Sequence, residues 1–321
     1  MSIIKAPAGG GTFRYIKKKD YDPVKHILFD LSTLGLSAGN LHNYAWQKNG
    51  SVPTTAPHPL AASVNDKYYH IRQATGDLEE YDPQTGVWAI RASMPSPSDG
   101  CAACALGDKI YVSGGFDDRN AMRIYDTSTD TWTINSTALD KMRMEHTMAA
   151  GSDGRLYLFG HYHLDAEDIN NTVYDPTTDT SSAIAPLPIS SDIRYSAAVS
   201  IGDDIYIVGG EGSSNSSLYA YVWRYAPTSD TYETVSAMPG AKYQHALVAV
   251  SGKLIAIGGV STSDVYEYDP AGDRWIKASS LVSAGTEHAA AVIADRIYMT
   301  DSSGSFYEHD SERNILVMEV A

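Results

Sequence analysis

A phrase made of a turn, an apolar strand and a tyrosine anchor recurs along this 321-residue chain. Its clearest copies read GDKIYVSGG at 107–115 followed by IYDTSTDTW at 124–132, and GKLIAIGG at 252–259 followed by YEYDPAGDRW at 266–275. Repetition at about 40 to 50 residues is typical of architectures built from similar stacked or ringed units. Six copies align on one anchor position, which is occupied by Tyr81, Tyr125, Tyr174, Tyr225, Tyr268 and His309.

Each copy divides into four short strands separated by turn signals, as in HALVAVS, GKLIAIGG, DVYEYD and RWIKAS. The second strand is a nearly continuous apolar run, which predicts a strand covered on both faces. Paired glycines such as Gly114 and Gly115 follow it and allow a bend or a close approach of the backbone. Seven residues after the anchors, most copies carry a large or apolar side chain suited to an outer strand: Trp88, Trp132, Ser181, Tyr232, Trp275 and Leu316.

This pattern resembles the kelch-repeat family over residues 58–316. The resemblance implies an all-β fold, a six-bladed kelch-like β-propeller of four-stranded antiparallel blades, with a short extended N-terminal arm. Three copies depart from the pattern at the glycine pair. The first has Ile71-Arg72-Gln73, the third keeps only Gly160, and the last has Thr300-Asp301. We therefore expect less regular geometry in those blades.

Charge is distributed unevenly between the start of the chain and the rest. Residues 1–25 hold six basic and two acidic residues, a balance of plus 4, so a net charge of −15 leaves minus 19 on the remainder. An acidic body argues against nonspecific binding to nucleic acid or to anionic membranes. The sequence shows neither an apolar run of about 18 residues nor a secretory leader, so we expect no membrane span or export. The expected location is the cytoplasm, or the virion if the chain is viral.

The first 42 residues are interpreted as a basic N-terminal arm, and residues 43–321 as the propeller. Trp46 precedes Pro53 by seven residues, as Trp88 precedes Pro95, so Asn43–Lys48 is predicted to be an outer strand. Pairing of this strand with the last blade would close the ring. The last copy has an outer-strand candidate of its own at 315–320, and the sequence leaves both possibilities open.

One face of the propeller is the candidate binding surface. In an antiparallel blade, the loop that enters the first strand and the loop between the second and third strands lie at the same end. Carboxylates and histidines gather on these loops and are predicted to converge on the central opening. A histidine that recurs at one repeat position also fits hydrogen bonding between blades. The candidate residues are Asp99, Asp117, Asp118, Glu145, His146, Arg194, His245, Glu287 and His288.

A metal site is a further candidate, although no cofactor is expected. His161, His163 and Asp165 would point to one side of an extended loop, and this ligand set suits zinc. A merely solvated acidic loop is the alternative. Cys101 and Cys104 are separated by three residues on an expected strand, so they should face opposite sides and remain unpaired.

Two functional hypotheses follow. The chain lacks a G-x-S-x-G elbow, a P-loop and an HExxH motif, which favours a non-enzymatic interaction or structural propeller. Such a protein would be a subunit of a larger assembly such as a phage virion, binding a protein partner or its own copies through an arm that contains Arg14, Lys17, Lys18 and Lys19.

The alternative is a carbohydrate-active enzyme that resembles the sialic-acid epimerases. Arginine would hold an acidic sugar while a glutamate and a histidine exchange a proton at carbon. Its candidate residues are Arg143, Glu145, Arg194, Glu287 and His288.

Overall fold

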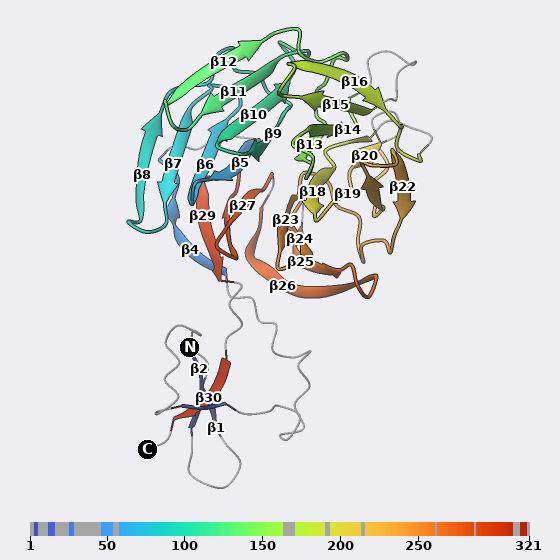
Figure 1. Ribbon diagram of the computed structural model, residues 1–321. Coiled ribbons are helices and arrows are strands. Elements are labelled where there is room, and N and C mark those ends of the chain that lie inside the picture. The colour runs from blue at the N-terminus through green and yellow to red at the C-terminus, as the bar shows by residue number, and fades with distance from the viewer. Residues whose placement is uncertain are drawn as a thin grey trace.

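The fold is all β and is organised as a ring of six blades (Figure 1). The computed structural model describes residues 3–5, 12–16, 26–28, 46–53, 58–162, 171–189, 193–212, 216–260, 262–285, 287–310 and 315–319. Within these residues there are six antiparallel blade sheets of four strands each. The prediction of a six-bladed propeller is confirmed. Within the same ranges, no helix is long and apolar enough to cross a membrane.

Blades 1 to 3 each take four consecutive strands, numbered from the centre outward. Blade 1 contains β5 (Pro59–Val64), β6 (Lys67–Arg72), β7 (Leu78–Asp82) and β8 (Val87–Arg91). Blade 2 contains β9 (Cys101–Leu106), β10 (Lys109–Gly114), β11 (Met122–Asp126) and β12 (Thr131–Asn135). Blade 3 contains β13 (Thr147–Ala150), β14 (Leu156–Phe159), β15 (Asn171–Asp175) and β16 (Thr180–Ile184).

Blades 4 to 6 repeat this order, with a small ribbon added beside blade 4 and with the outer strand of blade 6 taken from the start of the chain. Blade 4 contains β18 (Ala197–Ile201), β19 (Asp204–Val208), β21 (Val222–Ala226) and β22 (Thr231–Thr234), and a small ribbon pairs β17 (Ile193–Arg194) with β20 (Glu211–Gly212) beside it. Blade 5 contains β23 (Ala246–Val250), β24 (Lys253–Ile257), β25 (Thr262–Asp269) and β26 (Arg274–Gly285). Blade 6 contains β27 (Ala289–Ile293), β28 (Arg296–Thr300), β29 (Ser305–Asp310) and β4 (Trp46–Ser51).

The hydrophobic core lies between blades. Ile71 and Leu78 of blade 1 pack in one buried cluster with Ile110 and Val112 of blade 2. The other blade interfaces hold similar clusters of second-strand and third-strand side chains. The second strands are therefore covered on both faces, which is why their sequences lack the polar and apolar alternation of a half-exposed strand.

The start of the chain completes the last blade. β4 pairs with β29, and Trp46 lies opposite His309, as Trp88 lies opposite Tyr81 in blade 1. Leu316, which the repeat spacing placed in this outer position, instead pairs with Tyr15 through β30 (Ile315–Glu319) and β2 (Thr12–Ile16). Of the two outer-strand candidates that the sequence left open for blade 6, the N-terminal one pairs with β29, so the outer strand of this blade comes from the opposite end of the chain.

A separate four-stranded sheet contains the described residues of the region interpreted as an arm. Its order is β1 (Ile3–Lys5), β2, β30 and β3 (His26–Leu28). None of these described strands pairs with a blade strand. The proposed domain boundary between residues 42 and 43 stays a prediction.

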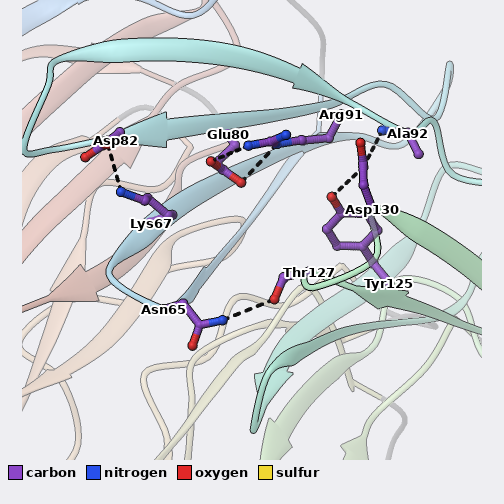
Figure 2. A network of polar contacts seen from close by, with 9 residues as sticks. All are labelled: Asn65, Lys67, Glu80, Asp82, Arg91, Ala92, Tyr125, Thr127 and Asp130. Atoms are coloured by element: carbon purple, nitrogen blue, oxygen red, sulfur yellow. Dashed lines mark hydrogen bonds and ion pairs between the residues drawn. The ribbon is translucent and has the colours of Figure 1, made fainter.

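We call the end of the ring that carries the loops entering the first strands the funnel face, and the other end the opposite face. On the opposite face, the Tyr125 hydroxyl donates to Asp130 Oδ1 at 2.7 Å, and the same oxygen accepts from the Ala92 amide of blade 1 at 2.9 Å (Figure 2). The Trp132 indole donates to the Ala92 carbonyl at 2.7 Å. Equivalent tyrosine-to-aspartate bonds join Tyr174 to Asp179, Tyr225 to Asp230 and Tyr268 to Asp273. The repeated anchor thus stabilises neighbouring blades against each other.

Candidate functional site

A ring of six residues with left-handed backbone conformation surrounds the centre of the funnel face. Each of them precedes the first strand of its blade by one or two residues. A residue other than glycine rarely adopts this conformation, so its recurrence in all six blades identifies one shared loop geometry. The φ angles are 50° at His58, 77° at Gly100, 56° at Glu145, 54° at Tyr195, 52° at Gln244 and 58° at Glu287.

Backbone hydrogen bonds link this ring from blade to blade. The Glu145 amide donates to the Gly100 carbonyl at 2.7 Å, and the Tyr195 amide donates to the Glu145 carbonyl at 2.8 Å. The Gln244 amide donates to Tyr195 at 3.2 Å, and the His288 amide donates to Gln244 at 3.4 Å. The loops that present the candidate side chains therefore depend on one another for their position.

Side chains replace the backbone bonds where blade 6 meets blade 1 and where blade 1 meets blade 2. Glu287 Oε2 accepts from the His58 amide at 2.9 Å, and Glu287 Oε1 lies 2.5 Å from His58 Nε2. The Gln73 side chain donates to the His58 carbonyl at 2.6 Å and accepts from the Cys101 amide at 2.7 Å. Gln73 stands where regular copies carry glycine, so the irregular first copy still holds its place in the ring.

A cavity of about 380 Å³ lies inside this ring. Six of the predicted site residues line it: Asp99, Glu145, His146, His245, Glu287 and His288. Sequence reasoning missed Gln73, Phe116 and Ser196, which also line it. Of these three residues, only Gln73 is marked out in the sequence, because it stands where regular copies carry the second glycine of the pair.

The other predicted residues of this face lie outside the cavity lining. Asp117 is exposed on the loop after β10, and its amide donates to Ser98 Oγ at 2.9 Å. Asp118 accepts from the Ser136 hydroxyl at 3.1 Å. Arg194 binds Glu145 at 3.0 Å and Glu211 at 3.1 Å, and its guanidinium lies 5.1 Å from the centre of the Tyr162 ring.

Two of the cavity histidines contact the preceding blade. His146 Nε2 lies 2.7 Å from Ser113 Oγ in blade 2, and His288 Nδ1 accepts from the Gly259 amide of blade 5 at 3.2 Å. His245 has no hydrogen-bond partner among the described residues, because Val208 stands in blade 4 where Ser113 stands in blade 2. Burial lowers the pKa of His146, lowers that of His245 to about 3 and lowers that of His288 to about 4. All three are therefore neutral near pH 7.

The residues of the enzymatic hypothesis all make polar contacts within the protein. Glu145 is only 7% exposed and accepts from the Arg194 guanidinium and from the Tyr195 hydroxyl. Arg143 is buried, donates to the Gly160 carbonyl at 3.2 Å and to Thr172 Oγ1 at 2.5 Å, and does not line the cavity. Glu287 and His288 do line it, so a carboxylate and an imidazole remain beside the space where a ligand would sit.

The metal and arm predictions fall largely outside the described residues. His163, Asp165, Lys17, Lys18 and Lys19 are not described, and Arg14 is described only through its place on β2. His161 is described, and its amide donates to the Ile193 carbonyl at 2.9 Å. Over the described part of the chain, no group of three or more metal-ligating side chains could hold an ion.

Family comparisons match this chain to kelch repeats. The KLHDC2/KLHL20/DRC7 Kelch-repeats domain matches residues 117–300, and the Kelch motif matches residues 97–134. Kelch-like protein 23 of Pongo abelii is 26% identical over 299 residues, which cover 88% of this chain and 51% of that protein. Kelch-like protein 35 of Mus musculus is 28% identical over 206 residues, which cover 64% of this chain and 35% of that protein.

The chain thus spans about half of these relatives, or less. Kelch domain-containing protein 3 of Bos taurus is 27% identical over 208 residues, covering 58% of this chain and 54% of that protein. A solved structure titled "Structure of YjhT" superposes with a TM-score of 0.70 at 14% identity, covering 84% of this chain and 99% of that one. At this identity the likeness concerns the fold alone.

Proposed function

This chain belongs to the kelch-repeat family, and we propose that it is a non-enzymatic interaction propeller that serves as a subunit of a larger assembly such as a phage virion. The main support is the engagement of Glu145, Arg194 and Tyr195 with one another on the funnel face. Both carboxylate oxygens of Glu145 already accept hydrogen bonds from donors within the protein, so this glutamate is not positioned as the general base for a ligand in the cavity.

Exposed apolar side chains on the funnel face support a partner surface. Phe116 is 41% exposed, Met142 55%, Leu218 48% and Tyr221 45%, and all four lie on loops of this face. The other large apolar residues that are exposed in the described part of the chain, such as Ile90 and Ile276, lie on outer strands. Apolar and aromatic side chains of this kind contribute most of the affinity in protein interfaces.

We infer that copies of the chain associate through the basic N-terminal residues and the acidic propeller. Light scattering on the full chain at low and moderate salt tests this. Wild-type protein should form oligomers that weaken as salt screens the attraction. Replacement of Lys17, Lys18 and Lys19 by glutamate should abolish them, whereas replacement by arginine keeps the charge and should preserve them. A wild-type monomer at every salt concentration would overturn self-association.

The alternative is a carbohydrate-active propeller, and one observation favours it. The cavity places Glu287 and His288 beside a space large enough for a small ligand. Exchange of carbon-bound protons of acidic sugars with solvent deuterium, followed by NMR with catalytic amounts of protein, tests the idea. Exchange that is lost in Glu287→Gln would support an enzyme, and no exchange above the buffer rate would leave the interaction proposal standing.

A further inference from the structure

The charged side chains that line the funnel cavity are acidic. Asp99, Glu145 and Glu287 contribute three carboxylates, and no lysine or arginine is among the described lining residues. Arg194 offsets part of this charge at Glu145, but it is shared with Glu211. His58 engages both oxygens of Glu287, through its backbone amide and through Nε2. Asp99 therefore remains the carboxylate without a cation partner among the described residues.

The histidines at the back of the cavity do not neutralise these carboxylates. Burial keeps His146, His245 and His288 uncharged near pH 7. A neutral imidazole offers one nitrogen that accepts a hydrogen bond. These side chains consequently add no positive charge to the cavity.

Several polar groups on this lining have no partner among the described residues. Ser196 is 8% exposed and His245 is 6% exposed, yet the hydroxyl of one and both ring nitrogens of the other are unsatisfied. Asp99 Oδ1 is buried and unsatisfied as well. Buried polar groups are normally hydrogen-bonded, so a molecule or side chain is expected to satisfy them. A carboxylate oxygen only accepts, and its partner must therefore donate.

The mouth of the cavity suits a long cationic side chain. Phe116 lines it and is 41% exposed, which leaves part of an aromatic ring beside the acidic lining. An ammonium group is attracted to an aromatic face and to a carboxylate, while its aliphatic stem packs on apolar surface. The lining thus matches a lysine side chain better than an anion or a purely apolar group.

Positive charge is concentrated in one segment of the chain. Residues 1–25 hold six of the 24 lysines and arginines, and three of these form the run Lys17-Lys18-Lys19. The remainder of the chain carries minus 19. We propose that the funnel cavity receives a lysine side chain from residues 17–19 of a second copy, with Asp99 as its principal acceptor. This inference rests on the proposed self-association and identifies the funnel cavity as the site that binds the basic segment of the second copy.

The test compares Asp99→Asn with Asp117→Asn in the full chain. Both variants remove one negative charge from the same face, but only Asp99 lines the cavity. Binding of a fluorescent peptide with the sequence of residues 11–25 is measured on protein whose own Lys17, Lys18 and Lys19 are glutamate. Asp99→Asn should weaken binding about tenfold or more, as expected for loss of a charge-assisted hydrogen bond in an enclosed site. Asp117→Asn should change it by about twofold or less, as expected for a screened surface charge.

The outcomes separate this inference from the proposed function. Peptide binding that falls equally in both variants, or in neither, overturns the cavity as receptor while self-association can still be seen by light scattering. Acetylation of the three peptide lysines should abolish binding, and unchanged binding would also overturn the inference. Glu287→Gln provides a second cavity variant, because glutamine keeps a hydrogen-bonding group opposite His58. It too should weaken peptide binding more than Asp117→Asn does.

Discussion

The two faces of this propeller use the same repeat in different ways. On the opposite face, four blades make the same tyrosine-to-aspartate bond with the same residue types, from Tyr125 and Asp130 to Tyr268 and Asp273. On the funnel face, six loops share one left-handed backbone position, yet its residues are His, Gly, Glu, Tyr, Gln and Glu. The repeat therefore specifies side chains where they stabilise neighbouring blades, and only backbone geometry where they surround the cavity.

The faces should respond to acid in different pH ranges, and this is the largest effect we expect. Burial keeps the pKa of the cavity histidines His146, His245 and His288, and of His70 on β6 beside Thr300, below that of an unfolded histidine. Below about pH 6.5 the unfolded chain binds protons at these residues and the folded chain does not, so the free energy of unfolding falls with pH. The loss between pH 7 and pH 5.5 should be about 5 kcal/mol for the four together.

The opposite face should lose stability only in stronger acid. Hydrogen bonds from Ser128 lower the pKa of Asp126, and those from Thr177 lower that of Asp175. The stability that these carboxylates contribute is present above the ordinary aspartate pKa and is lost as pH falls below it. Urea unfolding at several pH values measures both ranges. His245→Gln should remove about a quarter of the change between pH 7 and pH 5.5, and equal slopes in both proteins would contradict the assignment.

A methyl group should be far more costly on the funnel face than on the opposite face of the same blade. At Gly114 a Cβ would lie 2.3 Å from the Arg143 carbonyl oxygen of the next blade, whereas at Gly107 it would meet nothing within 4 Å. Both glycines have positive φ, 65° and 62°. Gly114→Ala should lower the free energy of unfolding by about 2 to 5 kcal/mol, and Gly107→Ala by about 1 to 2 kcal/mol. Similar denaturation midpoints for both variants would show that the blades separate easily at this point.

Removal of one anchor hydroxyl tests how much the opposite face stabilises the ring. Tyr125→Phe removes the bond to Asp130 and should cost about 1.5 kcal/mol in urea unfolding. Tyr268→Phe in blade 5 should cost a similar amount, and the two losses should add because the sites share no partner. A double variant that loses much more than the sum would indicate coupling through the whole ring. Peptide binding at the funnel cavity should be unchanged in all three proteins.

The smallest expected effect on stability is that of Asp99→Asn. Asp99 Oδ1 has no partner among the described residues, so amide substitution should change the free energy of unfolding by less than about 0.5 kcal/mol. Asp130→Asn is the matched change on the opposite face, where the carboxylate accepts from both Tyr125 and Ala92. It should destabilise the protein measurably. Comparable unfolding curves for the two variants would remove the distinction between a binding face and a stabilising face.

Most of the fold could be predicted because its signals are local. The anchors, the apolar second strands and the glycines recur in most of the six copies, so the copies reinforce one another when they are aligned. The site was less predictable. The sequence pattern indicated Asp99 and Arg194 as candidates together with Glu145, whereas the left-handed residues equivalent to Glu145 are Gly100 and Tyr195. Adjacent residues of these loops differ in backbone conformation, and the spacing of apolar residues in the sequence does not indicate which of them is left-handed.

The sequence by itself determined the number of blades, the positions of the recurring anchor residues and the uneven charge. Only the tertiary structure decided which strand completes blade 6, because the segments around Trp46 and Leu316 were both outer-strand candidates and only strand pairing distinguishes them. It also decided which polar residues line the cavity: Asp99 does and Asp117 does not. Both decisions depend on contacts between residues far apart in the chain, and a repeat of about 45 residues holds no information about them.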